Sequence, residues 1–183
     1  MREYVSLLRG INVGGKTLRM DGLLKVYESL GLRDVKSYIQ SGNVLFNEKN
    51  VDVESVKEEL QNRIRSRFGL DVTVIIRKRG ELQGIIERNP FIASGGGELK
   101  RMYVTFMEES PKGEPPQSLR SDTNAKDDFR MIGTEIYLYC PGGYGKTVFS
   151  NSFFEKKLGV RATTRNWNTV TELNRIANEP DAR

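Results

Sequence analysis

The fold is decided by residues 52–77, which read DVESVKEELQNRIRSRFGLDVTVIIR. The first part of this stretch carries apolar residues at helical spacing: Val53, Val56, Leu60, Ile64 and Phe68. Gly69 follows the last of them and favours a helix end there. The β-branched run 72–77 then predicts a strand. A helix of 52–68 followed by a strand of 72–77 is the closing half of a larger unit.

The residues upstream complete that unit. Residues 3–8 (EYVSLL) predict a strand, and residues 20–30 carry leucines at helical spacing before Gly31. Two β-rich runs, 35–39 (VKSYI) and 43–46 (NVLF), are separated by the turn signal Ser41-Gly42 and predict a hairpin. The resulting order is β-α-β-β-α-β, which is the ferredoxin-like split βαβ arrangement.

The second half of the chain repeats this order in a weaker form. Residues 101–107 (RMYVTFM) resemble the first strand, and strands near 128–132 and 135–140 predict a second hairpin across Gly133-Thr134. The helix expected between them is broken by three prolines in 108–127. A short helix near 150–158, a brief strand at 160–163 and a terminal helix at 168–178 follow.

We therefore predict an α+β protein with two ferredoxin-like (βαββαβ) units in tandem, the second degenerate and carrying an extra C-terminal helix. The expected organisation is a first unit at 1–79, a linking helix with a Gly-rich joint at 80–98, and a second unit with the C-terminal helix at 99–183. A single mixed sheet is the alternative.

Composition excludes several classes of chemistry. The chain has no histidine, which excludes histidine-based acid/base catalysis, catalytic triads with histidine and His-ligated metals. Cys140 is the only cysteine, so neither an internal disulfide nor a thiolate zinc cluster can form. The apolar run 4–8 is too short for a signal peptide or a membrane span. We expect a cytoplasmic protein without metal, cofactor or membrane association.

The loop RGINVGGK at 9–16 lies between a predicted strand and a predicted helix. Gly14 and Gly15 can adopt positive φ and expose backbone N–H groups, and Arg9 and Lys16 add positive charge. Together with a helix N-terminus these groups form a candidate anion cradle. The glycine spacing matches neither a Walker A loop nor a dinucleotide fingerprint. The alternative is a tight strand-to-helix connection that requires glycine only for its geometry.

A second glycine-rich segment, CPGGYGKT at 140–147, also lies between a predicted strand and a predicted helix. A Walker A loop needs glycine five positions before Gly145, and that position is Cys140. The segment is therefore interpreted as an ordinary turn that presents Lys146.

A third polar run, TTRNWNT at 163–169, surrounds the only tryptophan. Asn168 or Thr169 is expected to cap the terminal helix, with Glu172 placed for a capping box with Thr169. This leaves Arg165, Asn166 and Trp167 unexplained, and an arginine beside an aromatic ring can stack on a base or bind an oxyanion. The alternative is that Trp167 packs between the two halves while Arg165 forms an ion pair.

Alternation along the strands of the first half divides their residues between two faces. We assign one set to the helix side: Val5, Leu7, Val35, Ile39, Val44, Phe46, Val72, Val74 and Ile76. The opposite face then carries Tyr4, Ser6, Leu8, Tyr38, Gln40, Asn43, Leu45, Thr73, Ile75 and Arg77. This second face is too apolar to remain exposed.

Nucleic acid is an unpromising partner for this chain. The third strand offers Asn43 and Leu45 on the open face instead of the stacking aromatics of RNA-binding sheets. The net charge is only +5, and the richest basic run is split between 63–67 and 77–79. We expect weak, non-specific binding at most.

Four separated motifs, LLRGINVGG, YIQSGNVLF, FFEKKLGV and ATTRNWNTV, resemble a bacterial family that opens with the RGINVGGK signature and is catalogued as a domain of unknown function. The resemblance extends from Tyr4 to about Leu173. It implies a bacterial cytosolic protein with a duplicated ferredoxin-like fold and no established activity. The family pattern falls on Arg9, Gly10, Asn12, Gly14, Gly15, Lys16, Gln40, Ser41, Gly42, Asn43, Arg165, Asn166 and Trp167.

These observations predict binding of a small, phosphate-bearing anion at the first loop. The candidate ligand-binding residues are Arg9, Asn12, Gly14, Gly15, Lys16, Gln40, Asn43, Arg165, Asn166 and Trp167. One alternative is a phosphoryl hydrolase analogous to acylphosphatases, which share the βαββαβ order. In that hydrolase Arg9 would hold the phosphate and Asn43 (or Asn12) would orient water. Another alternative is a non-enzymatic protein that binds a partner.

Overall fold

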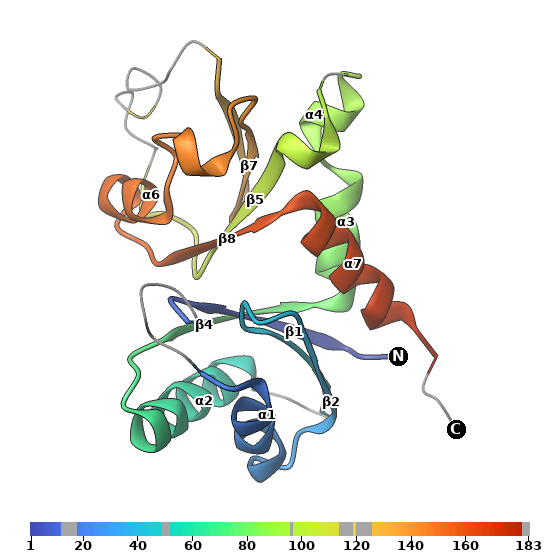
Figure 1. Cartoon of the computed structure of the whole chain (residues 1–183), viewed down its shortest axis with the longest axis vertical. Helices are drawn as coiled ribbons and strands as arrows, with labels where there is room; N and C mark the ends of the chain where they lie inside the picture. The colour runs from blue at the N-terminus through green and yellow to red at the C-terminus, as the bar shows by residue number, and fades with distance from the viewer. Residues whose placement is uncertain (12–17, 49–51, 96, 114–118, 120–125, 181–183) are drawn as a thin grey trace. The chain divides into compact units, whose positions relative to one another are not determined.

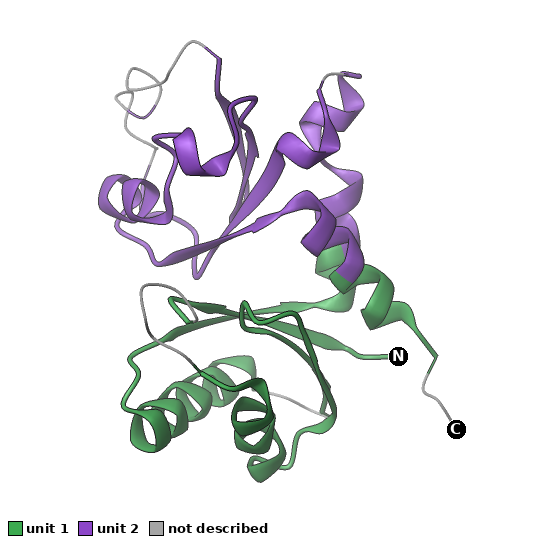
Figure 2. Ribbon diagram, in the orientation of Figure 1, with its two compact units in different colours: residues 1–82, 173–183 green, residues 83–172 purple. Residues whose placement is uncertain are grey.

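The structure is a computed structural model that describes residues 1–11, 18–48, 52–95, 97–113, 119 and 126–180 (Figure 1). The chain divides into two compact units (Figure 2). Unit 1 comprises 1–82 together with 173–183, and unit 2 comprises 83–172. The expected boundaries 1–79, 80–98 and 99–183 follow the chain in order, whereas the compact units group residues 173–183 with unit 1.

Unit 1 has the βαββαβ order expected from its sequence. Its elements are β1 (Tyr4–Arg9), α1 (Met20–Ser29), β2 (Arg33–Tyr38), β3 (Asn43–Asn47), α2 (Val53–Phe68) and β4 (Thr73–Lys78). The strands form an antiparallel sheet in the order β2-β3-β1-β4, and α1 and α2 cover one of its faces (Figure 1).

The two ends of helix α2 are set by a capping residue, Asp52, and by a glycine, Gly69. The side chain of Asp52 accepts a hydrogen bond from the backbone N–H of Glu54, which satisfies one of the unpaired donors of the first turn. At the other end Gly69 adopts φ 66° and its N–H donates to the Arg65 carbonyl oxygen at 2.8 Å. Leu60 and Ile64 bury the apolar stripe against the sheet.

The assignment of β1 residues to the two faces was wrong for all five residues assigned, Tyr4, Val5, Ser6, Leu7 and Leu8. Tyr4 and Leu8 lie in the helix-side core, and Tyr4 stacks on Phe46 with ring centroids 5.4 Å apart. Ser6 lies on the same face, where its hydroxyl and that of Tyr27 in α1 are 2.6 Å apart. Val5 and Leu7 are fully buried on the opposite face. Both alternating sets of β1 are largely apolar, so the pattern alone could not fix the phase.

Unit 2 contains a second sheet of its own. After α3 (Arg79–Glu87), α4 (Pro90–Ala93) and a 3₁₀ turn η1 (Leu99–Arg101) come β5 (Met102–Met107), β6 (Asp128–Ile132) and β7 (Glu135–Tyr139). The chain continues through η2 (Tyr144–Lys146), α6 (Asn151–Leu158), β8 (Ala162–Asn166) and α7 (Trp167–Asn178). The antiparallel strand order is β6-β7-β5-β8, the same topology as unit 1.

This second sheet confirms two ferredoxin-like units and shows that the single mixed sheet was the wrong alternative. The hairpin across Gly133 is confirmed, with Asp128 opposite Tyr139 and Ile132 opposite Glu135. The final strand lies at Ala162–Asn166 instead of 160–163, and the terminal helix begins at Trp167. No described helix combines the length and apolar character needed to cross a bilayer.

Candidate functional site

The first predicted loop starts from a sharp left-handed bend at the end of β1. Arg9, opposite Thr73 in β4, is the last residue of the strand and is half-buried. Gly10 then adopts φ 79°, and Ile11 turns back into the core, where only 4% of it is exposed. Asn12, Gly14, Gly15 and Lys16 lie outside the described residues. The bend at Gly10 therefore has the positively charged Arg9 on one side and the buried Ile11 on the other.

The turn between β2 and β3 packs directly on this bend. The Leu8 N–H donates to the Gly42 carbonyl oxygen at 2.8 Å. Gly42 has φ 71°, and a Cβ atom placed on it would lie 2.5 Å from Ile11 Cδ1 and 2.8 Å from Leu8 Cβ. Glycine is therefore required here on both conformational and steric grounds. The structure thus brings the predicted residues Arg9, Gln40 and Asn43 into one region of unit 1.

Asn43 holds the turn in shape. It is fully buried opposite Leu7, and its amide nitrogen donates to the Tyr38 carbonyl oxygen at 3.2 Å and to Ser41 Oγ at 2.8 Å. Both N–H donors of the Asn43 amide are engaged within the hairpin. Gln40 lies in the same turn and is exposed.

The loop is followed by the first turn of α1, which begins at Met20. Leu18 and Met20 are buried and anchor this end, as Ile11 anchors the other. Arg19 occupies the N-cap position and its side chain makes no capping hydrogen bond. The exposed Arg19 guanidinium instead pairs with Asp21 at 3.2 Å, and its hydrogen bond holds the pKa of that carboxyl below the ordinary value. The first-turn N–H groups of α1 thus have no cap from the Arg19 side chain.

The predicted residues of the polar run 163–169 lie in unit 2, where one of them has a structural role. Asn166 Oδ1 accepts a hydrogen bond from the Thr169 N–H at 2.8 Å, the geometry of a helix N-cap. The prediction that Asn168 or Thr169 caps the helix was therefore wrong, because the helix begins earlier, at Trp167. Trp167 is buried, with 3% of its surface exposed.

Arg165 is a buried cation. Only 8% of it is exposed, and its Nη1 donates to Thr163 Oγ1 at 2.7 Å and to the Thr164 carbonyl oxygen at 3.0 Å. Burial penalises the charged form and lowers the pKa of Arg165 to about 10.

Unit 1 has an arginine at the equivalent position. Arg77 lies opposite Val5 in the first sheet, as Arg165 lies opposite Val104 in the second. Arg77 is 7% exposed, and its Nη1 also donates to the preceding carbonyl, that of Ile76, at 3.1 Å. Sequence reasoning counted Arg77 with the surface basic run. Aligning the last strands of the two units, TVIIRK and ATTRN, would have revealed the correspondence.

The turn at 140–147 contributes the hydroxyl group of Tyr144 to the side-chain hydrogen bonds of unit 2. Tyr144 OH donates to Thr164 Oγ1 at 3.0 Å, and Thr164 shares a 2.7 Å hydrogen bond with Thr105. Thr105 occupies the register position that Ser6 has in unit 1, where the partner hydroxyl is that of Tyr27 in α1. Tyr144 therefore contacts the hydrogen-bond partner of Thr105, whereas in unit 1 Tyr27 contacts Ser6 itself. Lys146 is exposed, as the turn interpretation expects.

A model of the family described as "Protein of unknown function (DUF1697)" matches residues 1–137. The chain belongs to this family. The residues matched to DUF1697 include the first loop and the β2–β3 turn, whereas Arg165, Asn166 and Trp167 lie beyond them. No curated protein matches the chain.

Among solved structures, the conserved bacterial protein SP0830 from Streptococcus pneumoniae is similar to this DUF1697 chain. The TM-score is 0.72 at 22% sequence identity, and the alignment covers 97% of this chain and 99% of that one. At this identity the likeness shows a shared fold.

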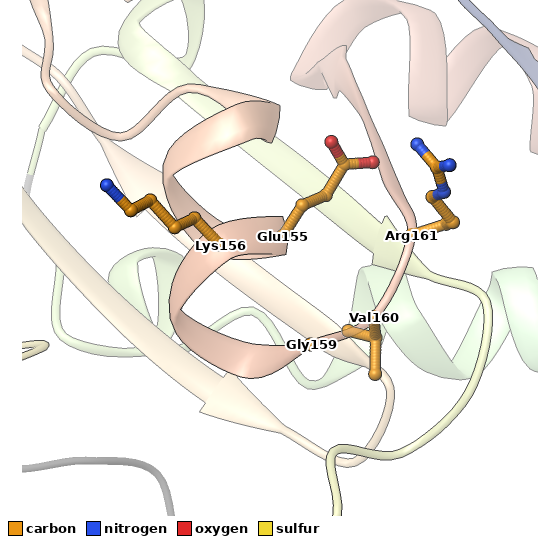
Figure 3. Close-up of a pocket in the computed structure, with 5 residues that line it drawn as sticks. All are labelled: Glu155, Lys156, Gly159, Val160 and Arg161. Carbon is orange, nitrogen blue, oxygen red and sulfur yellow. The ribbon is translucent and has the colours of Figure 1, made fainter.

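A surface pocket of about 340 Å³ contains none of the predicted residues (Figure 3). It is lined by Glu155, Lys156, Gly159, Val160 and Arg161 at the end of α6. The two cations are opposed by the Glu155 carboxylate, which accepts the Ala162 N–H at 3.0 Å, and by the negative end of the helix dipole. These opposing charges make the pocket a poor match for a phosphate.

The basic residues are dispersed. Arg63 pairs with Glu59, Arg65 with Asp71 and Arg79 with Glu3. Among the residues that the structure describes, no cluster of three or more acidic, cysteine or histidine side chains is placed to hold a metal ion.

Proposed function

We propose that this protein binds a small phosphate-bearing anion at the loop that follows β1. The observation that carries the proposal is the bend at Arg9 and Gly10, fixed by the contact of Ile11 and Leu8 with Gly42. The positively charged Arg9 is the last residue of β1, where the chain leaves the sheet. The glycine-rich sequence NVGGKT follows, with a further cation at Lys16.

The two ends of the loop support the same proposal. The loop leads to α1, where the side chain of the N-cap residue Arg19 accepts no hydrogen bond from the first-turn N–H groups. Helix N-termini carry a partial positive charge and donate backbone hydrogen bonds to anions. Ile11 and Leu18 are both buried, so the six residues between them start and finish at fixed points.

Binding rather than hydrolysis is the function that the geometry favours. In the acylphosphatase-like alternative Asn43 would orient the attacking water. Both amide N–H groups of Asn43 instead donate to Tyr38 and Ser41, which holds the turn together. Asn12, the other candidate for orienting water, lies outside the described residues.

The test is a titration with inorganic phosphate by isothermal calorimetry, on wild type and on the variants Arg9→Ala and Lys16→Ala. Loss of one charge-assisted contact should weaken binding roughly 10- to 150-fold, from about 1.5–3 kcal/mol. Arg63→Ala removes the same charge from an exposed helix position and is the matched control. Melting temperatures are measured in parallel to separate binding from folding, because Arg9 is the half-buried last residue of β1 and its replacement also removes packing at the strand end.

The outcomes separate the three functional classes. Phosphate binding lost only in the loop variants supports the proposal, and equal loss in Arg63→Ala contradicts it. Turnover of an acyl phosphate by wild type, abolished in Arg9→Ala, would establish the hydrolase instead. Absence of binding by any inorganic or organic phosphate would leave a non-enzymatic partner-binding role.

A further inference from the structure

The turn at 140–147 brings two cations against a pair of neighbouring glycines (Figure 1, between β7 and α6). The Arg101 guanidinium lies against Gly143, since its Nη1 is 3.2 Å from the place of an added Cβ atom. The Lys146 side chain lies against Gly142, where an added Cβ atom would be 4.0 Å from its Cδ. Consecutive Cα atoms are only about 3.8 Å apart. The two positive side chains therefore converge on one short segment of backbone.

The backbone of the turn holds Arg101 in this place. Gly143 adopts φ 89°, a conformation that disfavours residues with a side chain. Its N–H donates to the Cys140 carbonyl oxygen at 2.8 Å, and the Cys140 N–H donates to the Arg101 carbonyl oxygen at 2.9 Å. Cys140 is fully buried. Main-chain hydrogen bonds to a buried residue thus fix the start of β5 beside the turn.

No ion pair neutralises these cations. Among the residues that the structure describes, neither Arg101 nor Lys146 pairs with a carboxylate. Glu98, the acidic residue nearest to Arg101 in the sequence, pairs instead with Lys100 at 2.8 Å. Asp127 acts on the buried thiol at the start of the turn through its charge and pairs with neither cation. Two like charges held close together repel each other, and a bound anion would remove that repulsion.

A tyrosine hydroxyl adds a neutral donor to the same turn. Tyr103 lies two residues after Arg101 across the extended Met102, so alternation puts the two side chains on one face. The Tyr103 hydroxyl oxygen accepts a hydrogen bond at 3.4 Å from the N–H of Tyr144, the residue after Gly143. Accepting this bond leaves the hydroxyl hydrogen to donate. The two tyrosine rings, with centroids 5.2 Å apart, support the hydroxyl in this position.

We infer that unit 2 binds a phosphate group at this turn, with Arg101, Lys146 and the Tyr103 hydroxyl as its donors. All three side chains donate hydrogen bonds, and two of them carry positive charge, so the site suits a doubly charged anion with several acceptor oxygens. A guanidinium matches the geometry of two phosphate oxygens, and an ammonium group adds charge without a fixed direction. The site belongs to unit 2 alone and does not depend on the proposed function of the first loop.

The test follows the backbone amide resonances of Gly142 and Gly143, the turn glycines, by two-dimensional ¹H–¹⁵N NMR while inorganic phosphate is added. Ionic strength is held constant with sodium chloride, because salt screens exposed charges. In wild type the two resonances should shift and saturate. Arg101→Gln and Lys146→Gln should each weaken the affinity about tenfold, the loss of one charge-assisted hydrogen bond. Lys156→Gln removes the same charge from an exposed position of α6 and should leave the affinity unchanged within about twofold.

Further variants and a second probe sharpen the test. Tyr103→Phe keeps the ring and removes only the hydroxyl, so it should weaken the affinity about two- to fivefold. Arg101→Lys keeps the charge and should bind phosphate more tightly than Arg101→Gln. Lys146 is exposed, so Lys146→Gln should melt at the wild-type temperature, which separates its loss of affinity from unfolding. Phenyl phosphate that binds the turn glycines at least as tightly as inorganic phosphate indicates an ester as the ligand, and weaker binding indicates the free ion.

The outcomes keep this site distinct from the first loop. Shifts that do not saturate, or an equal loss of affinity in Lys156→Gln, overturn the site at the turn. Arg9→Ala should leave phosphate binding at the turn unchanged. If the turn glycines respond to phosphate while Gly10 and Gly42 do not, the site at the turn stands and the proposed function fails. The reverse response overturns the site at the turn and leaves the proposed function standing.

Discussion

Replacing Gly42 with alanine tests the contact on which the candidate site depends. Gly42 has φ 71°, and the added Cβ would lie 2.5 Å from Ile11 Cδ1 and 2.8 Å from Leu8 Cβ. The terminal methyl of Ile11 can rotate away, but Leu8 Cβ is fixed to the central strand β1. The turn or the strand must therefore move.

The structure supplies a control that separates conformation from contact. Gly31, after α1, has φ 78° and nothing within 4 Å of its added Cβ. Gly31→Ala should therefore lower the free energy of unfolding only by the cost of holding alanine in the left-handed region, about 1–2 kcal/mol. Gly42→Ala should incur the same penalty plus about 1–3 kcal/mol for overpacking. The difference between the two variants measures the contact between the turn and the first bend.

Urea unfolding followed by far-UV circular dichroism gives the free energies of unfolding, and hydrogen exchange gives the local effect. The Leu8 amide, which donates to the Gly42 carbonyl oxygen at 2.8 Å, should exchange faster in Gly42→Ala than in Gly31→Ala. Phosphate affinity should fall only in Gly42→Ala. If the two variants are equally stable within about 0.5 kcal/mol, the turn does not pack tightly against the bend.

Two side chains and the net charge of the chain lead to further tests. Burial raises the pKa of Tyr27 above its ordinary value of 10.0, so the native state keeps a proton that the unfolded chain loses in alkali. The free energy of unfolding should therefore fall as pH rises above about 10, and Tyr27→Phe should flatten this slope by up to about 1.4 kcal/mol per pH unit in urea titrations at pH 9–11.5. Asn166→Ala should cost about 0.5–2 kcal/mol in thermal unfolding through loss of the helix cap, whereas its exposed neighbour Asn168→Ala should change stability by less than about 0.5 kcal/mol. Labelled oligonucleotides titrated at two salt concentrations should bind with dissociation constants near 10⁻⁴–10⁻⁶ M and a log–log salt slope of about −2 to −4, and sub-micromolar, sequence-dependent affinity would contradict the expectation.

Local signals were sufficient for the elements of the first unit. Helix α2 carries its own N-cap at Asp52, an apolar stripe with a 3.6-residue period and a left-handed glycine at 69, and each of these acts within a few residues of chain. The hairpin at Gly42 was equally clear, because a turn with positive φ favours glycine. The duplication followed from the repeated order of such elements.

Residue type predicted a helix cap at Asn168 or Thr169, whereas Asn166 caps the helix. Asn168 and Thr169 are as suitable for capping as Asn166 by residue type. The choice depends on where β8 ends, since pairing of Asn166 with Tyr103 in β5 fixes the last residue of the strand. Cap position was therefore decided by strand register, a contact between residues far apart in the chain.

The amino-acid sequence by itself determined the order of helices and strands, the βαββαβ repeat and the glycines at the bends, because these depend on periodicity and on backbone conformations that neighbouring residues impose. Tertiary structure decided which face of β1 meets the helices, where the arginines at 77 and 165 lie, and how Tyr144 reaches Thr164. In β1 the residues on both faces are largely apolar, so only packing of Tyr4 on Phe46 and the hydroxyl pair of Ser6 and Tyr27 select the phase. The strain at Ile39 was likewise invisible in the sequence, because a β-branched residue at the end of a strand looks ordinary until the turn places its φ at 52°.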